Sequence, residues 1–317
     1  MTHHAIPLIN SDFFHWSFVL QLVSQGLANG SIYALVALTI VIIYRTTGHL
    51  NFAQGEMATF GCLLVFTLAE KGGLPYWLAI PAVMAVSFLL GAGIERTLVR
   101  PLQSRGGYAV VILTLGLFLV FNSLDAAIWG TQPLRPTTPF PSNADDQFNL
   151  IHGDPLFFIR YSTIGVWVTL AVVVALLWFV LERTRLGLAY RAVAANRESA
   201  FLVGIPVGRM LALGWGLSAA IGSLAAVLVA QQSGALDFNL MFSIFVYAFA
   251  AATLGGLDST GGAVVGGLIV GLVEALVPQF FSFIGGELSL FMALLIIVIV
   301  LLVRPQGLYG AKRMERV

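Results

Sequence analysis

Polar side chains that could do chemistry interrupt the apolar sequence of this chain at two places. The first segment, 46–57, reads TTGHLNFAQGEM, and the second, 254–267, reads LGGLDSTGGAVVGG. Carboxylates, amides and a hydroxyl in apolar surroundings can hydrogen-bond a polar solute, and an ionisable residue there is a functional candidate because its burial is costly. The candidates for contact with such a solute are Asn51, Gln54, Glu56, Asp258 and Ser259.

Both segments also fit a purely structural interpretation. Glu56 suits the first turn of a helix, where the backbone is positively polarised, and Asn51 or Gln54 would then be the N-cap. Asp258 and Ser259 are equally typical of a tight turn. The glycines of the second segment have the small-xxx-small spacing of closely packed helices, in the pairs Gly262 and Gly266, and Gly267 and Gly271.

The rest of the sequence is unusually apolar. The 317 residues are 58% hydrophobic and 10% charged, the mean hydropathy is +0.92, and runs of about 20 apolar residues recur along the chain. We therefore expect an all-α polytopic membrane protein. The basic residues stand at the edges of apolar runs, which argues against nucleic-acid binding. The single cysteine, Cys62, belongs to no cluster with metal-ligand spacing, and we predict neither a metal site nor a cofactor.

Eight apolar stretches are candidates to cross a bilayer: residues 18–44, 50–69, 76–94, 108–130, 162–181, 210–230, 241–277 and 286–303. The stretch 241–277 is too long for one helix, so we divide it near Gly255–Gly262 into two short segments, which gives eight or nine crossings. The backbone groups freed where a membrane helix breaks cannot face lipid, so such segments are buried in protein or line a cavity. A pair of them, one in each half of a chain, is typical of a transport path.

Arginine placement predicts the orientation. Basic residues gather in the loop 95–107, in the segment 182–209 and from residue 304 onward, so these three regions should face the cytoplasm. The loop 131–161, with its three aspartates and its prolines, should be external. Arg45 puts the end of the first span inside, so the N-terminus is expected outside and the C-terminus in the cytoplasm.

The segment 182–209 carries five arginines against two glutamates and is too long for a simple tether. Leu188–Ala195 and Arg197–Val203 can each form a short helix, with Asn196 as an N-cap and Gly204 as a stop. Apolar residues recur among the charges, at Leu188, Val193, Phe201, Leu202 and Val203. This pattern is compatible with docking against a partner protein, but taken alone it favours an interfacial helix that rests on anionic lipid through its arginines.

Several segments resemble, in the same order, those of the permease subunits of branched-chain amino acid ABC importers, the LivH type. The longest, RTRLGLAYRAVAANRESAFLVGI at 183–205, resembles the cytoplasmic coupling region of that family. The others are NGSIYAL at 29–35, NFAQGE at 51–56, Glu95-Arg96 followed by Arg100-Pro101-Leu102, residues 254–274, and RPQGL at 304–308. The family often has histidine where this chain has Gln54, so a titratable group is absent at that position.

The resemblance implies an ABC importer permease-like bundle, with one transmembrane permease domain over residues 1–317, in a bacterial plasma (inner) membrane. It implies three kinds of protein partner besides the lipid bilayer. They are a second permease subunit, for which the family favours a paralogue, two cytoplasmic ATPase subunits, and an external solute-binding protein that delivers branched-chain or related amino acids. The chain lacks a G-x-x-x-x-G-K-[ST] phosphate loop, so separate subunits would hydrolyse ATP. Within the coupling region the candidate residues are Arg185, Gly187, Arg191, Arg197, Glu198 and Gly204.

A secondary transporter, or a channel for a small polar solute such as urea, is the alternative function. It would share the apolar spans and broken helices but would not need the long segment 182–209. It would also place a coupling carboxylate deep in a central span, for which Asp125 is the nearest candidate, although it stands close to the outer end of its span. An enzyme is disfavoured because neither H-E-x-x-H nor G-x-S-x-G occurs.

Overall fold

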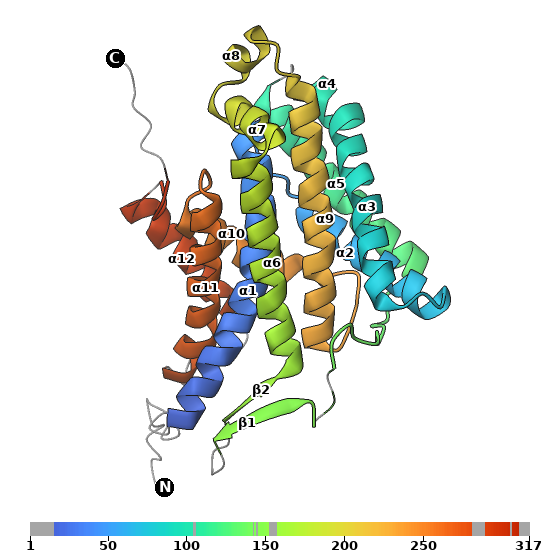
Figure 1. Cartoon of the computed structure of the whole chain (residues 1–317), viewed down its shortest axis with the longest axis vertical. Helices are drawn as coiled ribbons and strands as arrows, with labels where there is room; N and C mark the ends of the chain where they lie inside the picture. Colours follow the sequence, from blue (N-terminus) through green and yellow to red (C-terminus); the bar gives the residue numbers. More distant parts are fainter. Residues whose placement is uncertain are drawn as a thin grey trace, which may run out of the picture.

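The computed structural model describes residues 16–103, 106–141, 143, 145–151, 157–280, 289–304 and 306–310, which form a bundle of long helices (Figure 1). Several residues used in the orientation argument lie outside the described residues: Arg105, Asp154, Lys312, Arg313 and Arg316. The first residues of the span predicted at 286–303 also lie outside them.

Two helices form the centre of the bundle, α1 (Trp16–Thr47) and α9 (Val207–Ser233). Their most apolar windows are 89% and 78% buried, whereas those of the other long helices are 22% to 33% buried. These peripheral helices are α3 (Tyr76–Ile94), α5 (Gly107–Trp129), α6 (Tyr161–Arg183) and α11 (Thr260–Phe280). A helix that is apolar all round but exposed on one side is suited to lipid, so the peripheral helices form the membrane-facing surface.

Shorter elements complete the bundle. They are α2 (Gln54–Phe66), which continues as the π-helical turn η2 (Thr67–Lys71), η3 (Glu95–Val99) and α4 (Arg100–Gln103), which extend α3, and α10 (Phe242–Gly255) and α12 (Ser289–Val303). Six helices of the described residues are long and apolar enough to cross a membrane. The stretch 241–277 is divided, as predicted, but only α10 is short, because α11 has 21 residues.

The bundle has two chemically different ends. At the basic end lie Arg45, the η3–α4 segment, α7 (Arg185–Ala195) and α8 (Arg197–Leu202). Arg100 of α4 donates a hydrogen bond of 2.6 Å to the carbonyl of Gly208 at the start of α9, so these basic segments are neighbours in space. The C-terminal residues Leu308 and Tyr309 bond to the last residues of α10 at the same end. The predicted grouping of the basic loops on one side is therefore confirmed for the described residues.

The opposite end, called the hairpin end here, carries the start of α1 and a small β-hairpin that the sequence did not reveal. Strands β1 (Gln147–Ile151) and β2 (Phe157–Arg160) pair antiparallel, with an irregular register between Asn149 and Ile151. The backbone N–H of Phe158 donates to Gln21 of α1 at 3.3 Å, so the hairpin is anchored to the bundle. It forms part of the loop that was predicted over 131–161.

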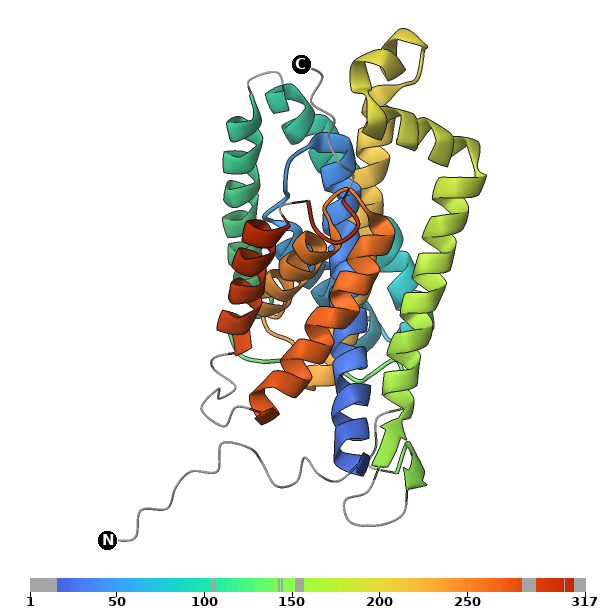
Figure 2. The same ribbon diagram turned by 90° about the vertical axis from the view of Figure 1, so that its left-hand side faces the viewer.

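Glycine contacts hold α11 close to its neighbours. A Cβ atom on Gly266 would lie 2.1 Å from the carbonyl oxygen of Ala251 in α10, and one on Gly271 would lie 2.3 Å from Gly30 in α1. Real side chains are not accommodated at such distances, so the backbones touch only because these residues are glycine. The predicted small-xxx-small packing is confirmed, and α11 and α1 run side by side in Figure 2.

Candidate functional site

The first predicted break is a true interruption inside the bundle. After α1 ends, Gly48 adopts φ +68° and the chain runs without helical structure until α2 begins at Gln54. The Asn51 side chain accepts a hydrogen bond of 3.1 Å from the backbone N–H of Ala53, which turns the chain into α2. The N-cap of α2 is Ala53, without a side-chain cap bond. The interpretation of Asn51 or Gln54 as the N-cap is therefore wrong.

Gln54 joins α2 to the central helix α9. Its amide nitrogen donates to the carbonyl of Ser218 at 3.0 Å, and its amide oxygen accepts from Asn51 at 3.3 Å. A Cβ atom on Gly222 would lie 2.8 Å from the same amide nitrogen, so a glycine is required opposite it. The Ser218 hydroxyl donates in turn to the carbonyl of Thr39 in α1. Gln54 thus has partners on both sides, and its contacts are those of a packing residue.

Glu56 lies in the first turn of α2, as predicted, and is only 1% exposed. Its carboxylate accepts a hydrogen bond of 3.4 Å from the amide of Asn122 in α5. The same amide group is 3.3 Å from the carbonyl of Phe238 and 3.0 Å from the side-chain oxygen of Asn239. Asn239 is exposed. A row of hydrogen-bonded polar side chains therefore connects the buried Glu56 carboxylate to the surface between α5 and the connection from α9 to α10.

Sequence reasoning missed Asn122 and Asn239. Asn122 is a lone amide within the apolar run of α5, which was the available signal, since polar residues in such helices usually bond across a helix interface. Asp125 lies one turn further along α5, is fully buried, and neither of its oxygens has a hydrogen-bond partner among the described residues. Asp125 is the residue that the alternative function would use as a coupling carboxylate.

The second predicted break is a tight turn between α10 and α11. Gly256 adopts φ +104°, Asp258 is exposed, and the Ser259 hydroxyl oxygen accepts from the backbone N–H of Gly262 at 2.9 Å. Ser259 therefore caps the start of α11. The turn lies at the basic end, beside the C-terminal residues, so Asp258 and Ser259 are not brought together with the polar residues around Glu56.

Segment 182–209 folds into the two short helices that were predicted. α7 begins after Thr184, whose hydroxyl oxygen accepts from the N–H of Gly187 at 3.1 Å, and α8 begins after Asn196, whose side chain accepts from the N–H of Ser199 at 2.9 Å. Gly204, with φ +83°, follows the end of α8. The predicted cap at Asn196 and stop at Gly204 are confirmed, whereas the cap at Thr184 was not foreseen.

The two helices are fastened to α1 and α6. Gly187 lies so close to the end of α6 that a Cβ atom would be 2.3 Å from the carbonyl oxygens of Val180 and Leu181. The Tyr190 hydroxyl donates to the carbonyl of Ile42 in α1. Burial raises the pKa of Tyr190 to about 12, which keeps this hydroxyl protonated as a donor. A displacement of α7 must therefore move the end of α1 with it.

Both arginines predicted to contact a partner also have partners within the chain. Arg191 forms an ion pair with Glu182, and the Arg197 guanidinium donates to the carbonyl of Thr46, the last turn of α1. Burial lowers the pKa of Arg197. The pKa of His49 is lowered by burial and by the nearby Arg197 charge, so His49 is neutral beside that guanidinium. In contrast, Glu198 and Arg185 are exposed.

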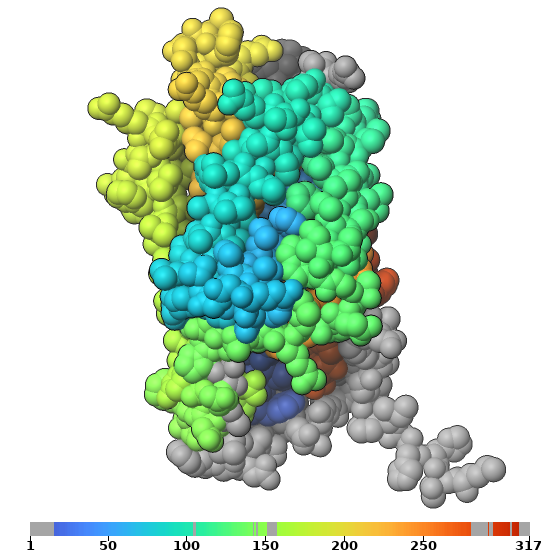
Figure 3. Space-filling view, turned by 90° about the vertical axis from the view of Figure 1, so that its right-hand side faces the viewer, coloured from blue at the N-terminus to red at the C-terminus, as the bar shows by residue number. Residues whose placement is uncertain are grey.

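An apolar tip projects from α8. Phe201, Leu202 and Val203 are 71%, 83% and 75% exposed, although they follow one another at the end of a charged segment. In Figure 3 this part of the chain stands out beyond the body of the bundle. Of the apolar residues predicted for docking, Val193 alone is buried, at 1% exposed, and packs into the chain's own core. The tip is thus free to contact another surface.

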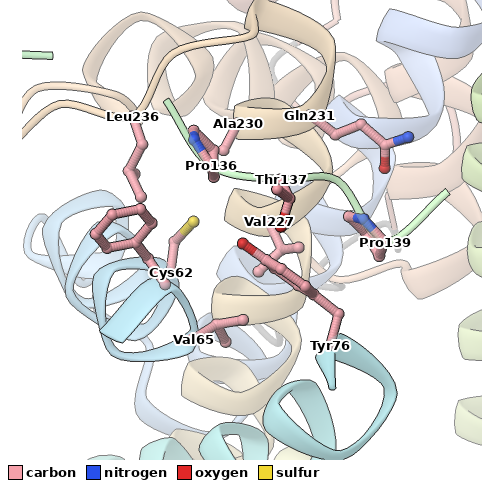
Figure 4. A pocket seen from close by; sticks show the side chains of 11 residues that line it. Cys62, Val65, Tyr76, Pro136, Thr137, Pro139, Val227, Ala230, Gln231 and Leu236 are labelled. Carbon is pink, nitrogen blue, oxygen red and sulfur yellow. The ribbon is translucent and has the colours of Figure 1, made fainter. Parts of the chain in front are cut away.

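Cavities within the bundle differ greatly in size. Around Cys62, Tyr76 and Thr137 there is a gap of about 10 Å³, which has room for one water molecule at most (Figure 4). A cavity of about 270 Å³ lies toward the hairpin end, between α1, α9, α10 and α11. Within the described residues, no group of three or more His, Cys, Asp or Glu side chains could hold a metal ion.

The matching family model and the curated relatives agree with each other. The family model described as "Branched-chain amino acid transport system / permease component" matches residues 22–303. The high-affinity branched-chain amino acid transport system permease protein BraD of Pseudomonas aeruginosa is 30% identical over 96% of this chain and 99% of its own length. LivH of Escherichia coli K12 is 29% identical over 95% and 98%. A solved structure, "PsaBC from Streptococcus pneumoniae in complex with Fab", has a TM-score of 0.45 at 15% identity, covering 90% of this chain and 92% of that chain.

These matches cover the α2 break, the α7–α8 pair and the glycine-packed α10 and α11 in one alignment. The resemblance predicted from short motifs extends over nearly the whole chain. The chain belongs to the family of branched-chain amino acid transport system permease components.

Proposed function

We propose that this chain is one permease subunit of an ABC importer that moves branched-chain or related aliphatic amino acids. An external solute-binding protein would deliver the solute, two cytoplasmic ATPase subunits would supply the energy, and a second permease subunit, a paralogue of this chain, would complete the pathway. The observation that carries the proposal is the capped α7–α8 pair, whose apolar tip is exposed while its base is fastened to α1 and α6. A self-sufficient transporter has no need of such a pair.

In this proposal the ATPase docks on the tip formed by Phe201, Leu202 and Val203, with Arg185 and Glu198 at its edge. Gly187 and Gly204 allow the turns at the two ends of the pair. Arg191 and Arg197 do not contact the ATPase directly in this proposal. They hold the α7–α8 pair in place, because their partners are Glu182 and the end of α1. Closure of the ATPases on ATP would then displace the pair and shift the helices between two arrangements.

The topology proposed for the membrane follows the charge asymmetry. The basic end faces the cytoplasm of a bacterium, with segment 182–209 as the coupling element, and the loop 131–161 with its hairpin faces outward. The N-terminus is then external and the C-terminus cytoplasmic, within one permease domain over residues 1–317. The solute path passes the interrupted helix start around Glu56, since that carboxylate is reached from the surface through Asn122 and Asn239.

The substitution Leu202→Asp tests the docking tip. A charge at the centre of an apolar contact costs several kcal/mol of association energy, so we expect the ATPase subunits to be lost from the purified complex and amino acid uptake to fall by at least about tenfold. Leu150→Asp is the matched control, because Leu150 is 57% exposed on β1 at the opposite end. ATP-independent uptake of urea or an amino acid by the chain alone in liposomes would instead support a secondary transporter or channel.

A further inference from the structure

The large cavity at the hairpin end combines one carboxylate with amides and aliphatic side chains. Its volume is about 270 Å³, and it is an open cavity lined by helices from both halves of the chain. The side chains that define its chemistry are Gln25, Asn29, Tyr33, Gln232, Ile244 and Glu274. It is lined by residues of α1, α9, α10 and α11, and neither Glu56 nor Asn122 is among them.

Glu274 is the one charged residue among the described residues that line the cavity. One of its carboxylate oxygens accepts 2.6 Å from the Tyr33 hydroxyl and 3.2 Å from the Asn29 amide. Gln25 donates in turn to Asn29 at 3.2 Å, which orients that amide. The other oxygen has no hydrogen-bond donor among the described residues. The carboxylate is therefore held in a fixed direction by two neutral donors, and no Lys or Arg is among the described residues that line the cavity.

The cavity is closed on the side of the bundle centre. The rings of Tyr33 and Tyr247 stack with centroids 4.9 Å apart and an angle of 16° between their planes. Both rings are buried, at 3% and 5% exposed. The aliphatic side chains Ile32, Val229 and Ile244 form an apolar part of the wall, whereas Gln232 is exposed and carries a free amide at the rim. The negative Glu274, the neutral Gln232 amide and the aliphatic side chains thus form different parts of the cavity wall.

This arrangement matches one class of solute. We propose that the cavity binds an aliphatic α-amino acid as its zwitterion, with the ammonium group on the free oxygen of Glu274 and the carboxylate near the Gln232 amide. The hydrocarbon side chain would lie against Ile32, Val229 and Ile244. A dry cavity of about 150 Å³ is enough to hold benzene, so the volume of about 270 Å³ admits a solute of this size. The inference rests on the proposed function and adds to it a place where the permease itself recognises the solute.

Thiol labelling tests the cavity without relying on transport. In the complete importer carrying Cys62→Ala and Ser233→Cys, we expect a trimethylammonium methanethiosulfonate to react about tenfold faster than its sulfonate counterpart, because the Glu274 charge concentrates cations. Glu274→Gln should bring the two rates together. L-leucine should slow the labelling, whereas 4-methyl-2-oxopentanoate, which has the same shape without the ammonium group, should not. Equal protection by both compounds, or no charge preference, would overturn the proposal.

Uptake in proteoliposomes gives the second readout. Glu274→Gln should lower the initial rate of leucine uptake by about tenfold, in line with the loss of one charge-assisted contact. Glu70→Gln is the matched control, because Glu70 bonds to Thr137 near the same end of the bundle but outside the cavity, and it should leave uptake unchanged. Unchanged uptake in Glu274→Gln would contradict the proposal.

Two further outcomes separate the possible failures. If Glu274→Gln does not fold, Ile244→Trp narrows the cavity while leaving the carboxylate and its donors in place; it should abolish protection by leucine but keep the preference for the cationic reagent. Persistent protection would count against the site. If the wild-type importer shows no ATP-dependent amino acid uptake while the labelling behaves as expected, the cavity stands as an amino acid site and the proposed function fails.

Discussion

The two interruptions of the membrane helices look alike in sequence, yet they have different roles in the structure. At the first, between α1 and α2, the chain runs unwound inside the bundle, and Asn51, Gln54 and Glu56 are buried and hydrogen-bonded. At the second, between α10 and α11, the chain turns at the basic end, with Asp258 exposed and Ser259 bonded to its own helix. The first break brings together polar side chains of α2, α5 and α9, whereas the second brings the backbones of α10 and α11 against Leu308 and Tyr309.

The contrast shows how a candidate solute path differs from a segment that only packs two helices together. Amides and a carboxylate in the first break bond across helices, which is the role expected of polar residues that must be satisfied within a membrane. Glycines in the second break let backbones touch, as Gly255 and Gly262 do, and the polar residues only cap the turn. The two regions should therefore respond differently to substitution: the second through folding, and the first through transport.

The largest expected effect is on folding, at the second break. Gly262→Val would place a Cβ atom 2.3 Å from the carbonyl oxygen of Gly255, where neither backbone can yield. Overpacking of this kind costs about 1–3 kcal/mol or more, so we expect a lower Tm and a smaller yield of assembled protein. Gly261→Val is the control, because nothing lies within 4 Å of a Cβ there. Equal damage from both substitutions would show that the close approach does not matter.

Local chemistry predicted from the sequence agrees well with the structure. The spans follow from apolar length, and α7 and α8 follow from Asn196, Gly204 and their flanking residues, because caps and stops act within one turn. The grouping of basic loops at one end also follows, since it depends only on which spans separate them. The eight or nine predicted segments correspond to the six long helices and the shorter apolar helices α2, α10 and α12.

Contacts between side chains far apart in the chain could not be predicted from the sequence. Asn122 meets Glu56 across 66 residues, and Tyr33 meets Glu274 across 241 residues. Nothing near Glu274 distinguishes a cavity residue from one that reaches the membrane interface. Arg197 was expected to face a partner because of its charge, but it reaches the carbonyl of Thr46, 151 residues earlier. The β1–β2 hairpin was missed because its strands are only five and four residues long, although the sequence between them, HGDPL, has the glycine, aspartate and proline typical of a turn.

A smaller effect, on transport alone, is expected at the first break. Glu56→Gln keeps an oxygen that can accept from Asn122 but removes the charge. Because neutralising a buried carboxylate lowers its desolvation cost, the variant should be at least as stable as the wild type. If the charge acts on the solute, ATP-dependent uptake should fall by about tenfold, which is one charge-assisted contact. If Glu56→Gln transported at the wild-type rate, the Glu56 charge would have no role in transport. Both breaks would then serve only helix packing.

The smallest effect is expected at Asp258, and it is the sharpest test of the difference. Asp258→Asn removes a charge from an exposed turn in which asparagine is equally suitable, so stability should change by no more than about 0.5 kcal/mol. Uptake should stay within about twofold of the wild-type rate, since an exposed turn residue carries little of the energy of a buried contact. Ser259→Ala shows that the assay can detect a change here, because loss of the bond to Gly262 should cost about 1 kcal/mol. A tenfold loss of uptake in Asp258→Asn at normal stability would put the second break on the solute path, as the sequence pattern alone had predicted.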